Sequence, residues 1–283
     1  MTYSHQDFKY IHSSSTDTEE ERLKVQAKEA EKHLWHDLDL SLLIENDPKL
    51  FYLEVGCGVG AQTPALISRL PRDMRILGID IDKQQISRAN KNLNQYIPEK
   101  VHLQNADIIK YQFQNDSLSG AYICWVLEHI PYNNILELLI NLKNAIKGKG
   151  AIINIETIMD PINGMIVHDQ NNRTDPAIIK YLNALVECQK NLEGNANFGA
   201  RENMINCYNE AGFTNVSYEI LKISHPDEEL EASISYSKSL FESVSQKLLD
   251  TGIINHQDYN NAISALDYAK KFTWHAGRII ASK

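Results

Sequence analysis

The stretch from Glu54 to Gly60, with the sequence EVGCGVG, is the part of the chain whose residue types most clearly imply chemistry. The apolar run 50–53 before it predicts a buried strand, and residues 64–67 after it predict the start of a helix. A strand, a glycine-rich turn and a helix N-terminus together direct backbone N–H groups at a ligand. Glu54 adds a hydrogen-bond acceptor and a negative charge at the strand end. This combination suits a ligand that carries a positively charged amine beside an adenosine.

Two adenosine cofactors compete for this loop, NAD and S-adenosylmethionine. Gly56, Gly58 and Ala61 formally satisfy the dinucleotide fingerprint G-x-G-x-x-G/A. Asp80 follows the next predicted strand, and its carboxylate could accept hydrogen bonds from the ribose hydroxyls of either cofactor. These residues alone therefore do not separate the two ligands.

Three other features favour S-adenosylmethionine. Gly60 keeps the backbone close to a compact ligand, and the carboxylate of Glu54 would repel a diphosphate. Asp107 follows the third predicted strand, where its carboxylate could accept a hydrogen bond from an adenine amine. The expected cofactor is therefore S-adenosylmethionine.

Strand-like and helix-like segments alternate along the chain around these residues. Such alternation predicts a parallel sheet covered on both faces, with ligands at the carboxyl ends of its strands. We expect an α/β fold with a doubly wound, mostly parallel seven-stranded sheet and helical cap insertions. The predicted strands are 50–55, 75–80, 101–104, 121–125, 151–156, 215–223 and 272–281. The predicted helices of the central part lie near 64–70, 83–96 and 133–147.

Several motifs in chain order resemble those of the class I S-adenosylmethionine-dependent methyltransferases, which have a Rossmann-like fold. Residues 54–60 match the family motif E/D-x-G-x-G-x-G in full, and residues 78–82 (GIDID) and 105–107 (NAD) resemble its second and third motifs. Residues 125–130 (WVLEHI) resemble a segment of the quinone-biosynthesis type. Residues 10–12 with 21–23 are similar to a bacterial branch that methylates small molecules.

The resemblance implies a role for each matching residue. Asp80 would hold the ribose, and Ile81 would lie on the adenine ring. Asp107 would accept a hydrogen bond from the adenine amine, with Ile108 beside the ring. The residues expected near the methionine portion of the cofactor are Glu54, Gly56, Cys57, Gly58 and Gly60.

Two aromatic residues complete the expected cofactor site, and each implied role has a structural alternative. Trp125 would lie near the sulfonium, and Tyr10 would close over the cofactor from the N-terminal arm. Trp125, Ile81 and Ile108 could instead be core residues, and Asp107 could cap a turn.

His129 is the candidate general base, because it follows the strand end nearest the methyl group. Methyl transfer from a sulfonium mainly requires that the acceptor is held in line with the leaving sulfur. A base helps when the acceptor is a hydroxyl or a protonated amine. His129 could instead order its loop, and Tyr208, His168 and His225 are more distant alternatives.

The motifs divide the chain into a central domain and flanking segments. Residues 1–47 are expected to form an N-terminal arm and a lid helix, with Leu23 and Leu34 on its apolar face. Residues 48–283 are expected to form the methyltransferase domain, with cap segments near 158–200 and 225–271. The second cap segment could instead make a homodimer contact.

Composition excludes several classes of function. The net charge of −9 and the absence of a dense Lys/Arg run argue against a nucleic-acid partner. No apolar run reaches the roughly 18 residues of a membrane helix. The four cysteines form no CxxC pair, which argues against a metal site and fits a reducing cytoplasm.

The sequence thus predicts an S-adenosylmethionine-dependent methyltransferase that acts on a small molecule in the cytoplasm. A protein or RNA acceptor is one alternative. A non-catalytic module that only binds the cofactor is another.

Overall fold

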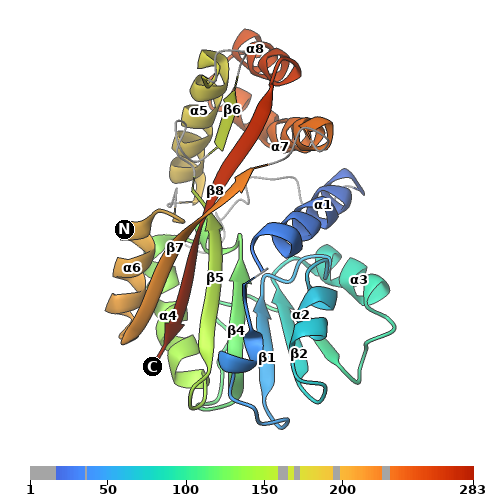
Figure 1. Cartoon of the computed structure of the whole chain (residues 1–283), viewed down its shortest axis with the longest axis vertical. Coiled ribbons are helices and arrows are strands. Elements are labelled where there is room, and N and C mark those ends of the chain that lie inside the picture. The colour runs from blue at the N-terminus through green and yellow to red at the C-terminus, as the bar shows by residue number, and fades with distance from the viewer. Residues whose placement is uncertain (1–16, 36, 159–164, 169–172, 194–197, 225–229) are drawn as a thin grey trace.

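A computed structural model describes residues 17–35, 37–158, 165–168, 173–193, 198–224 and 230–283 (Figure 1). Its centre is an eight-stranded sheet with the strand order β3-β2-β1-β4-β5-β8-β6, and β7 also pairs with β8. The first five strands run parallel: β1 (Phe51–Val55), β2 (Arg75–Asp80), β3 (Val101–Asn105), β4 (Leu118–Cys124) and β5 (Ala151–Thr157). Three strands run antiparallel to their neighbours: β6 (Met165–His168), β7 (Asn215–Ser224) and β8 (Lys271–Ser282).

This topology confirms the predicted doubly wound, mostly parallel sheet, and all seven predicted strands are present. The eighth strand, β6, was not predicted, because its four residues pair only with an extension of β8. The prediction also began the fourth strand too late and ended it at Trp125. The strand in fact includes Gly120, where a Cβ atom would approach the Tyr52 ring to 3.0 Å. It ends before Trp125, whose φ of +57° is incompatible with a strand.

Helices cover both faces of the sheet because side chains alternate along each strand. On β1, Tyr52 joins a cluster with residues of α1 (Asp17–His33) and α2 (Thr63–Arg69). Its neighbour Leu53 joins the opposite cluster, with residues of α4 (Tyr132–Ala145) and α6 (Arg201–Glu210). The remaining helix of this part, α3 (Lys83–Asn92), contacts β2 and β3.

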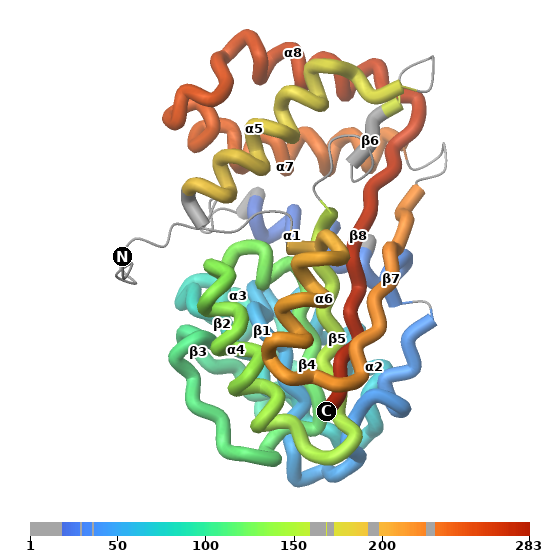
Figure 2. Tube along the Cα trace, turned by 90° about the vertical axis from the view of Figure 1, so that its left-hand side faces the viewer, coloured from blue at the N-terminus to red at the C-terminus, as the bar shows by residue number. Residues whose placement is uncertain are grey.

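Three further helices form a cap with its own apolar core: α5 (Pro176–Glu193), α7 (Leu230–Asp250) and α8 (His256–Asp267). Within the cap, the Tyr181 ring stacks on Phe241 at 4.0 Å, and its hydroxyl donates to the Phe241 carbonyl. Figures 1 and 2 show the cap beyond the carboxyl ends of the parallel strands. The first residues of β8 extend past β5 into it, since Thr157, the last residue of β5, pairs with Ala276.

A buried arginine ties the end of α1 to the sheet. The Arg278 side chain on β8 is 2% exposed, and its guanidinium donates to the Leu34 carbonyl at 2.9 Å. It also donates to the carboxylates of Asp37 and Glu219, both of which are about half exposed. The segment that follows α1 is therefore fixed against the antiparallel part of the sheet.

We predict that Arg278→Ala lowers the free energy of unfolding by about 2 kcal/mol, because it removes charged hydrogen bonds to two half-exposed carboxylates and leaves a backbone carbonyl without its donor. Urea unfolding followed by circular dichroism measures the change. Lys283→Ala is the control, since that ammonium lies 3.5 Å from Asp116 on the surface, and its loss should cost less than about 1 kcal/mol. Equal losses in the two variants would contradict the prediction.

Candidate active site

The glycine-rich loop follows β1 and turns back onto β2. Gly56, Gly58 and Gly60 have φ values of +63°, +52° and +73°, a left-handed region that favours glycine. The N–H groups of Gly56 and Cys57 both donate to the Ile79 carbonyl, at 2.8 and 3.1 Å. Gly60 donates to the Cys57 carbonyl at 2.8 Å. These three N–H groups therefore hold the loop in shape, which differs from the expectation that N–H groups of the turn face a ligand.

At Gly56 and Gly60, neighbouring elements approach the loop too closely for a side chain to fit. A Cβ atom at Gly56 would lie 2.5 Å from the Val126 side chain, which follows β4. At Gly60 it would lie 2.5 Å from Leu93, beside α3. Leu23 of α1 lies 3.8 Å from the corresponding position at Gly58. The loop is thus enclosed by three elements and presents backbone to anything bound beside it.

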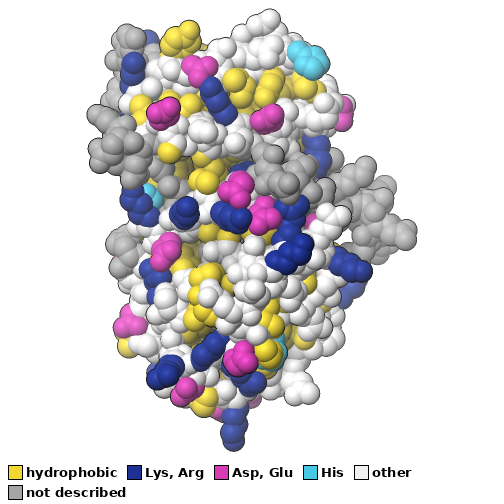
Figure 3. Space-filling model, turned by 90° about the vertical axis from the view of Figure 1, so that its right-hand side faces the viewer, with side chains coloured by type: hydrophobic (Ala, Val, Ile, Leu, Met, Phe, Trp, Pro, Cys, Tyr) yellow, Lys and Arg dark blue, Asp and Glu magenta, His cyan; other side chains and the backbone are white. Residues whose placement is uncertain are grey.

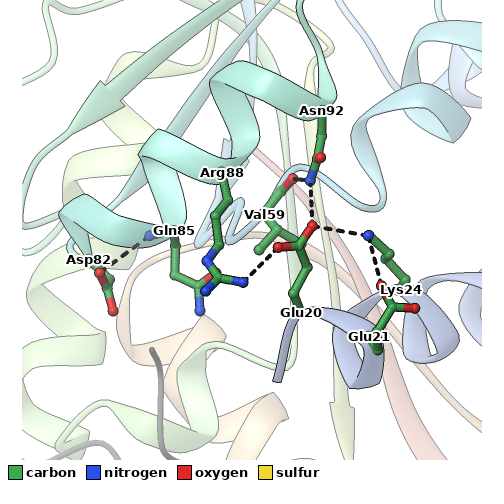
Figure 4. A network of polar contacts seen from close by, with 8 residues as sticks. All are labelled: Glu20, Glu21, Lys24, Val59, Asp82, Gln85, Arg88 and Asn92. Carbon is green, nitrogen blue, oxygen red and sulfur yellow. Dashed lines mark hydrogen bonds and ion pairs between the residues drawn. The ribbon is translucent and has the colours of Figure 1, made fainter. Parts of the chain in front are cut away.

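Helix α1 is tied to the loop by a polar network around Glu20 (Figure 4). The Glu20 carboxylate accepts from Arg88 at 2.6 Å and from Asn92 at 3.3 Å, both on α3. The amide of Asn92 also donates to the Val59 carbonyl in the glycine loop at 3.1 Å. Hydrogen bonds from Lys24 and Arg88 lower the pKa of Glu20 to about 2. This places α1 against the loop, where the sequence predicted a lid helix.

Two acidic residues flank the loop. Glu54 is 3% exposed and accepts a hydrogen bond from the Thr63 hydroxyl at 2.7 Å. Burial, with a smaller contribution from the charge of Asp80, raises the pKa of Glu54 to about 7. Asp80 accepts from the Gly58 and Asp82 N–H groups, one on each oxygen, at 2.8 Å. Burial raises the pKa of Asp80 as well.

The residues predicted to surround adenine lie just beyond Asp80. Ile81 is 63% exposed, which leaves an apolar surface at the end of β2. Ile108 is partly buried against the core cluster of α4 and α6. The Asp107 carboxylate accepts from the Ile109 N–H at 3.1 Å and lies 3.2 Å from the Lys110 ammonium, so it also caps a turn.

The remaining predicted residues differ in how the structure places them. Cys57 is buried, and burial raises the pKa of its thiol, which removes it as a nucleophile. Tyr208 is fully buried in the core, away from any role at the surface of the site. Tyr10 and His225 lie outside the described residues.

The turn after β4 brings together Trp125 and the candidate base. Trp125 is 9% exposed and its ring centroid lies 5.9 Å from that of Trp274 on β8. His129 ends a short 3-10 helix (Leu127–His129) and is 8% exposed. Its Nε2 atom lies 3.5 Å from a carboxylate oxygen of Glu128, which is also buried.

Sequence reasoning missed Glu156 at the end of β5. Its carboxylate accepts hydrogen bonds from the N–H groups of Val126, Leu127 and Glu128 at 3.3, 2.9 and 3.4 Å. The residue is fully buried, and burial together with the charge of Glu128 raises its pKa well above the ordinary value. A single acidic residue that ends the apolar strand AIINIE was the available signal, because a fully buried carboxylate needs dedicated partners.

The described part of the chain contains neither a metal-binding cluster nor a membrane-spanning helix. No group of three or more His, Cys, Asp and Glu side chains there is arranged to hold a metal ion. None of the helices described is both long and apolar enough to cross a membrane.

Residues 53–150, from β1 to the start of β5, match a family model described as a methyltransferase domain. This match covers the glycine loop, Asp80, Asp107 and His129. The chain carries a class I S-adenosylmethionine-dependent methyltransferase domain. The left-handed glycines, the exposed Ile81 and the two flanking carboxylates of this methyltransferase domain fit the cofactor of the family.

Sequence relatives of the methyltransferase domain include the carboxy-S-adenosyl-L-methionine synthases of two Shewanella strains, ANA-3 and MR-4. Each is 26% identical over 113 residues, which are 39% of this chain and 46% of the relative. The match thus spans less than half the length of these relatives.

Solved structures similar to the chain share its fold. Phosphoethanolamine N-methyltransferase 2 of Haemonchus contortus, with S-adenosylhomocysteine bound, has a TM-score of 0.51 and 12% identity, over 92% of this chain and 57% of that one. Geranyl diphosphate C-methyltransferase of Streptomyces coelicolor has a TM-score of 0.51 and 11% identity, over 92% of this chain and 77% of that one. A cyclopropane synthase of Mycobacterium tuberculosis has a TM-score of 0.53 and 13% identity, over 86% of this chain and 82% of that one.

A pair of glycine substitutions tests how closely Val126 packs against the glycine loop at Gly56. Gly56 and Gly252 have similar φ values, +63° and +69°, but a Cβ atom at Gly252 would meet nothing within 4 Å. Gly252→Ala should therefore cost about 1 kcal/mol, which is the backbone penalty alone. Gly56→Ala should cost about 2–4 kcal/mol, because overpacking against Val126 is added. Urea unfolding of both variants measures the difference, and equal costs would contradict the contact.

The raised pKa of Glu54 predicts a pH-dependent stability. The folded protein holds a proton on Glu54 up to about pH 7, whereas the unfolded chain releases it near 4.5. The stabilisation by the neutral acid is therefore fully present below about pH 4.5 and is lost as the pH rises through about 7.

Glu54→Gln keeps the neutral form at every pH and isolates this effect. Between pH 5 and 8 the wild type should lose about 2–3 kcal/mol of unfolding free energy relative to the variant. Urea unfolding of both proteins at pH 5 and pH 8 measures this change in unfolding free energy. Other titrating groups contribute equally to the wild type and the variant, so their effects cancel when the two proteins are compared. Parallel pH profiles would show that Glu54 is ionised in the folded protein.

Proposed function

We propose that the protein transfers a methyl group from S-adenosylmethionine to a small-molecule acceptor by in-line displacement. The observation that carries this proposal is the enclosed glycine loop with Glu54 and Asp80 beside it, inside the matched methyltransferase domain. The similar structures from Haemonchus and Streptomyces are named for methyltransferases of small molecules. That likeness supports a small acceptor.

Each residue of the proposed cofactor site supplies a specific contact. Each oxygen of the Asp80 carboxylate accepts one backbone hydrogen bond, so both keep capacity for a ribose hydroxyl. Ile81 would offer its exposed side chain to the adenine ring, and Asp107 would accept a hydrogen bond from the adenine amine. A cationic ligand beside Glu54 would favour its ionised form and so reverse the effect of burial.

The bound cofactor supplies a methyl group that is already activated by the positive sulfur, so the protein mainly has to position the acceptor and exclude water. We assign the general base to His129. The Glu128 carboxylate, 3.5 Å from Nε2, would stabilise the imidazolium formed when His129 takes a proton from the acceptor.

The cap supports a small acceptor because it stands beyond the carboxyl ends of the parallel strands, where this fold binds its ligands (Figure 2). We infer that residues 48–283 form one domain. Its cap segments near 158–200 and 225–271 would enclose the acceptor site. The four cysteines are buried and none of them is in a disulfide, which supports a reducing cytoplasm as the compartment. A homodimer contact through the second cap segment stays a prediction.

Calorimetric titration with S-adenosylhomocysteine tests the cofactor site. We expect the wild type to bind, and Asp80→Asn to raise the Kd roughly tenfold or more, because charge-assisted hydrogen bonds to the ribose are lost. Asp116→Asn is the matched control on the surface and should bind like the wild type. A folded wild type that does not bind would reject the proposal.

Mass spectrometry after incubation with S-adenosylmethionine and pooled metabolites then tests methyl transfer. An acceptor that gains one methyl group would support it. Binding without any transfer to small molecules would favour a macromolecular acceptor or a module that only binds the cofactor.

A further inference from the structure

Trp125 has a backbone conformation that is unusual for its type. Among the described residues, only Asp116 and Trp125 have a positive φ without being glycine, at +54° and +57°. Aspartate tolerates this region because its short side chain bonds locally, whereas a bulky side chain does so only under strain. Such strain often marks a functional position.

The side chain of Trp125 is unusual in a second, independent way. The residue is 9% exposed, and its indole Nε1–H is buried without a hydrogen-bond partner. The neighbouring Trp274 ring, 5.9 Å away between centroids, cannot provide an acceptor. A buried donor without a partner is rare in folded proteins and calls for an explanation.

Glu156 explains how the strained turn persists. Its carboxylate receives three consecutive N–H groups, those of Val126, Leu127 and Glu128. The Trp125 N–H donates to the Ile155 carbonyl at 2.9 Å, so the turn is fixed to β5 at adjacent points. Because Glu156 is fully buried at the end of a central strand, its own position is rigid.

The location of the turn indicates what the indole could bind. Val126, the residue after Trp125, lies against Gly56, so the turn that carries Trp125 contacts the loop assigned to the methionine portion of the cofactor. That portion carries an ammonium, which Glu54 suits, and also a carboxylate. The N–H groups of Gly56, Cys57, Gly58 and Gly60 are already used within the protein. The nearby side chains Glu54 and Asp80 would repel a carboxylate, which therefore needs another donor.

We propose that the indole Nε1–H of Trp125 donates to the carboxylate of the cofactor's methionine portion, and that Glu156 is the positioning residue that holds Trp125 for this contact. The inference rests on the proposed function, because it concerns the same cofactor site. It adds a recognition residue for the amino-acid end of the ligand and a structural reason for the buried acid on β5.

Two ligands that differ at the amino-acid end test the contact. S-adenosylhomocysteine carries the carboxylate, whereas 5′-methylthioadenosine keeps the adenosine and sulfur but lacks the whole amino-acid group. Trp125→Phe removes the N–H and keeps an aromatic ring. By calorimetry, the Kd of S-adenosylhomocysteine should rise about tenfold or more, as expected for a lost charge-assisted hydrogen bond, and that of 5′-methylthioadenosine should change less than about twofold. Trp274→Phe, the matched control, should leave the ratio of the two Kd values unchanged.

Glu156 is tested by the same ratio and by a spectroscopic signal. Glu156→Gln should reduce the preference for S-adenosylhomocysteine as Trp125→Phe does, and the double variant should show no further reduction, since both changes remove one contact. The near-ultraviolet circular dichroism of the Trp125–Trp274 pair should change in Glu156→Gln. Glu156→Asp, which keeps the carboxylate, should restore part of the preference.

The outcomes separate this inference from the proposed function. If the wild type binds S-adenosylhomocysteine but Trp125→Phe keeps the wild-type ratio, only the indole contact is overturned. The same holds if both ligands weaken equally. Should Glu156→Gln fail to fold, the Trp125→Phe ratio decides alone. A folded wild type that binds neither ligand overturns the proposed function and this inference together.

Discussion

The Ile79 carbonyl at the end of β2 receives the N–H groups of both Gly56 and Cys57, and this shared acceptor bends the chain back over the sheet edge. The bend requires left-handed backbone at the glycines, and it brings the Gly58 N–H to the Asp80 carboxylate. Everything else at the site follows from that geometry. Val126 and Leu93 can lie against the loop only because Gly56 and Gly60 carry no side chains.

Three acidic groups at the same sheet edge, two of them buried and Asp80 partly buried, give the site its electrostatic character. Glu54, Asp80 and Glu156 stand at the ends of adjacent or near-adjacent strands, and burial raises the pKa of each. Burying several carboxylates together costs stability unless each has specific partners. The Thr63 hydroxyl and the N–H groups at Asp80 and Glu156 are those partners. Such a concentration of perturbed carboxyl groups is typical of a functional site and favours a positively charged ligand.

The sequence predicted the parts of the molecule that depend on local pattern. The buried strands and the capped helix at Asp82 produce periodic signals within short windows, so their bounds agree with the structure to within a few residues. Contacts between distant segments leave no such signal. The pairing of β6, the network between Glu20 and Asn92, and the three N–H groups on Glu156 each depend on how the chain packs. The end of β4 was misjudged at Trp125 for the same reason, because a carboxylate on another strand fixes that turn.

One consequence follows from the length of β8. This single strand of 12 residues pairs with β5 in its second half, while its first residues pair with β6 and join the apolar core of the cap. Because one continuous strand belongs to both, the cap and the sheet are joined by main-chain hydrogen bonds and not only by connecting loops. Helix α1 touches α7 and is tied by side-chain ion pairs, that of Glu20 with Arg88 and, just beyond its end, that of Asp37 with Arg278.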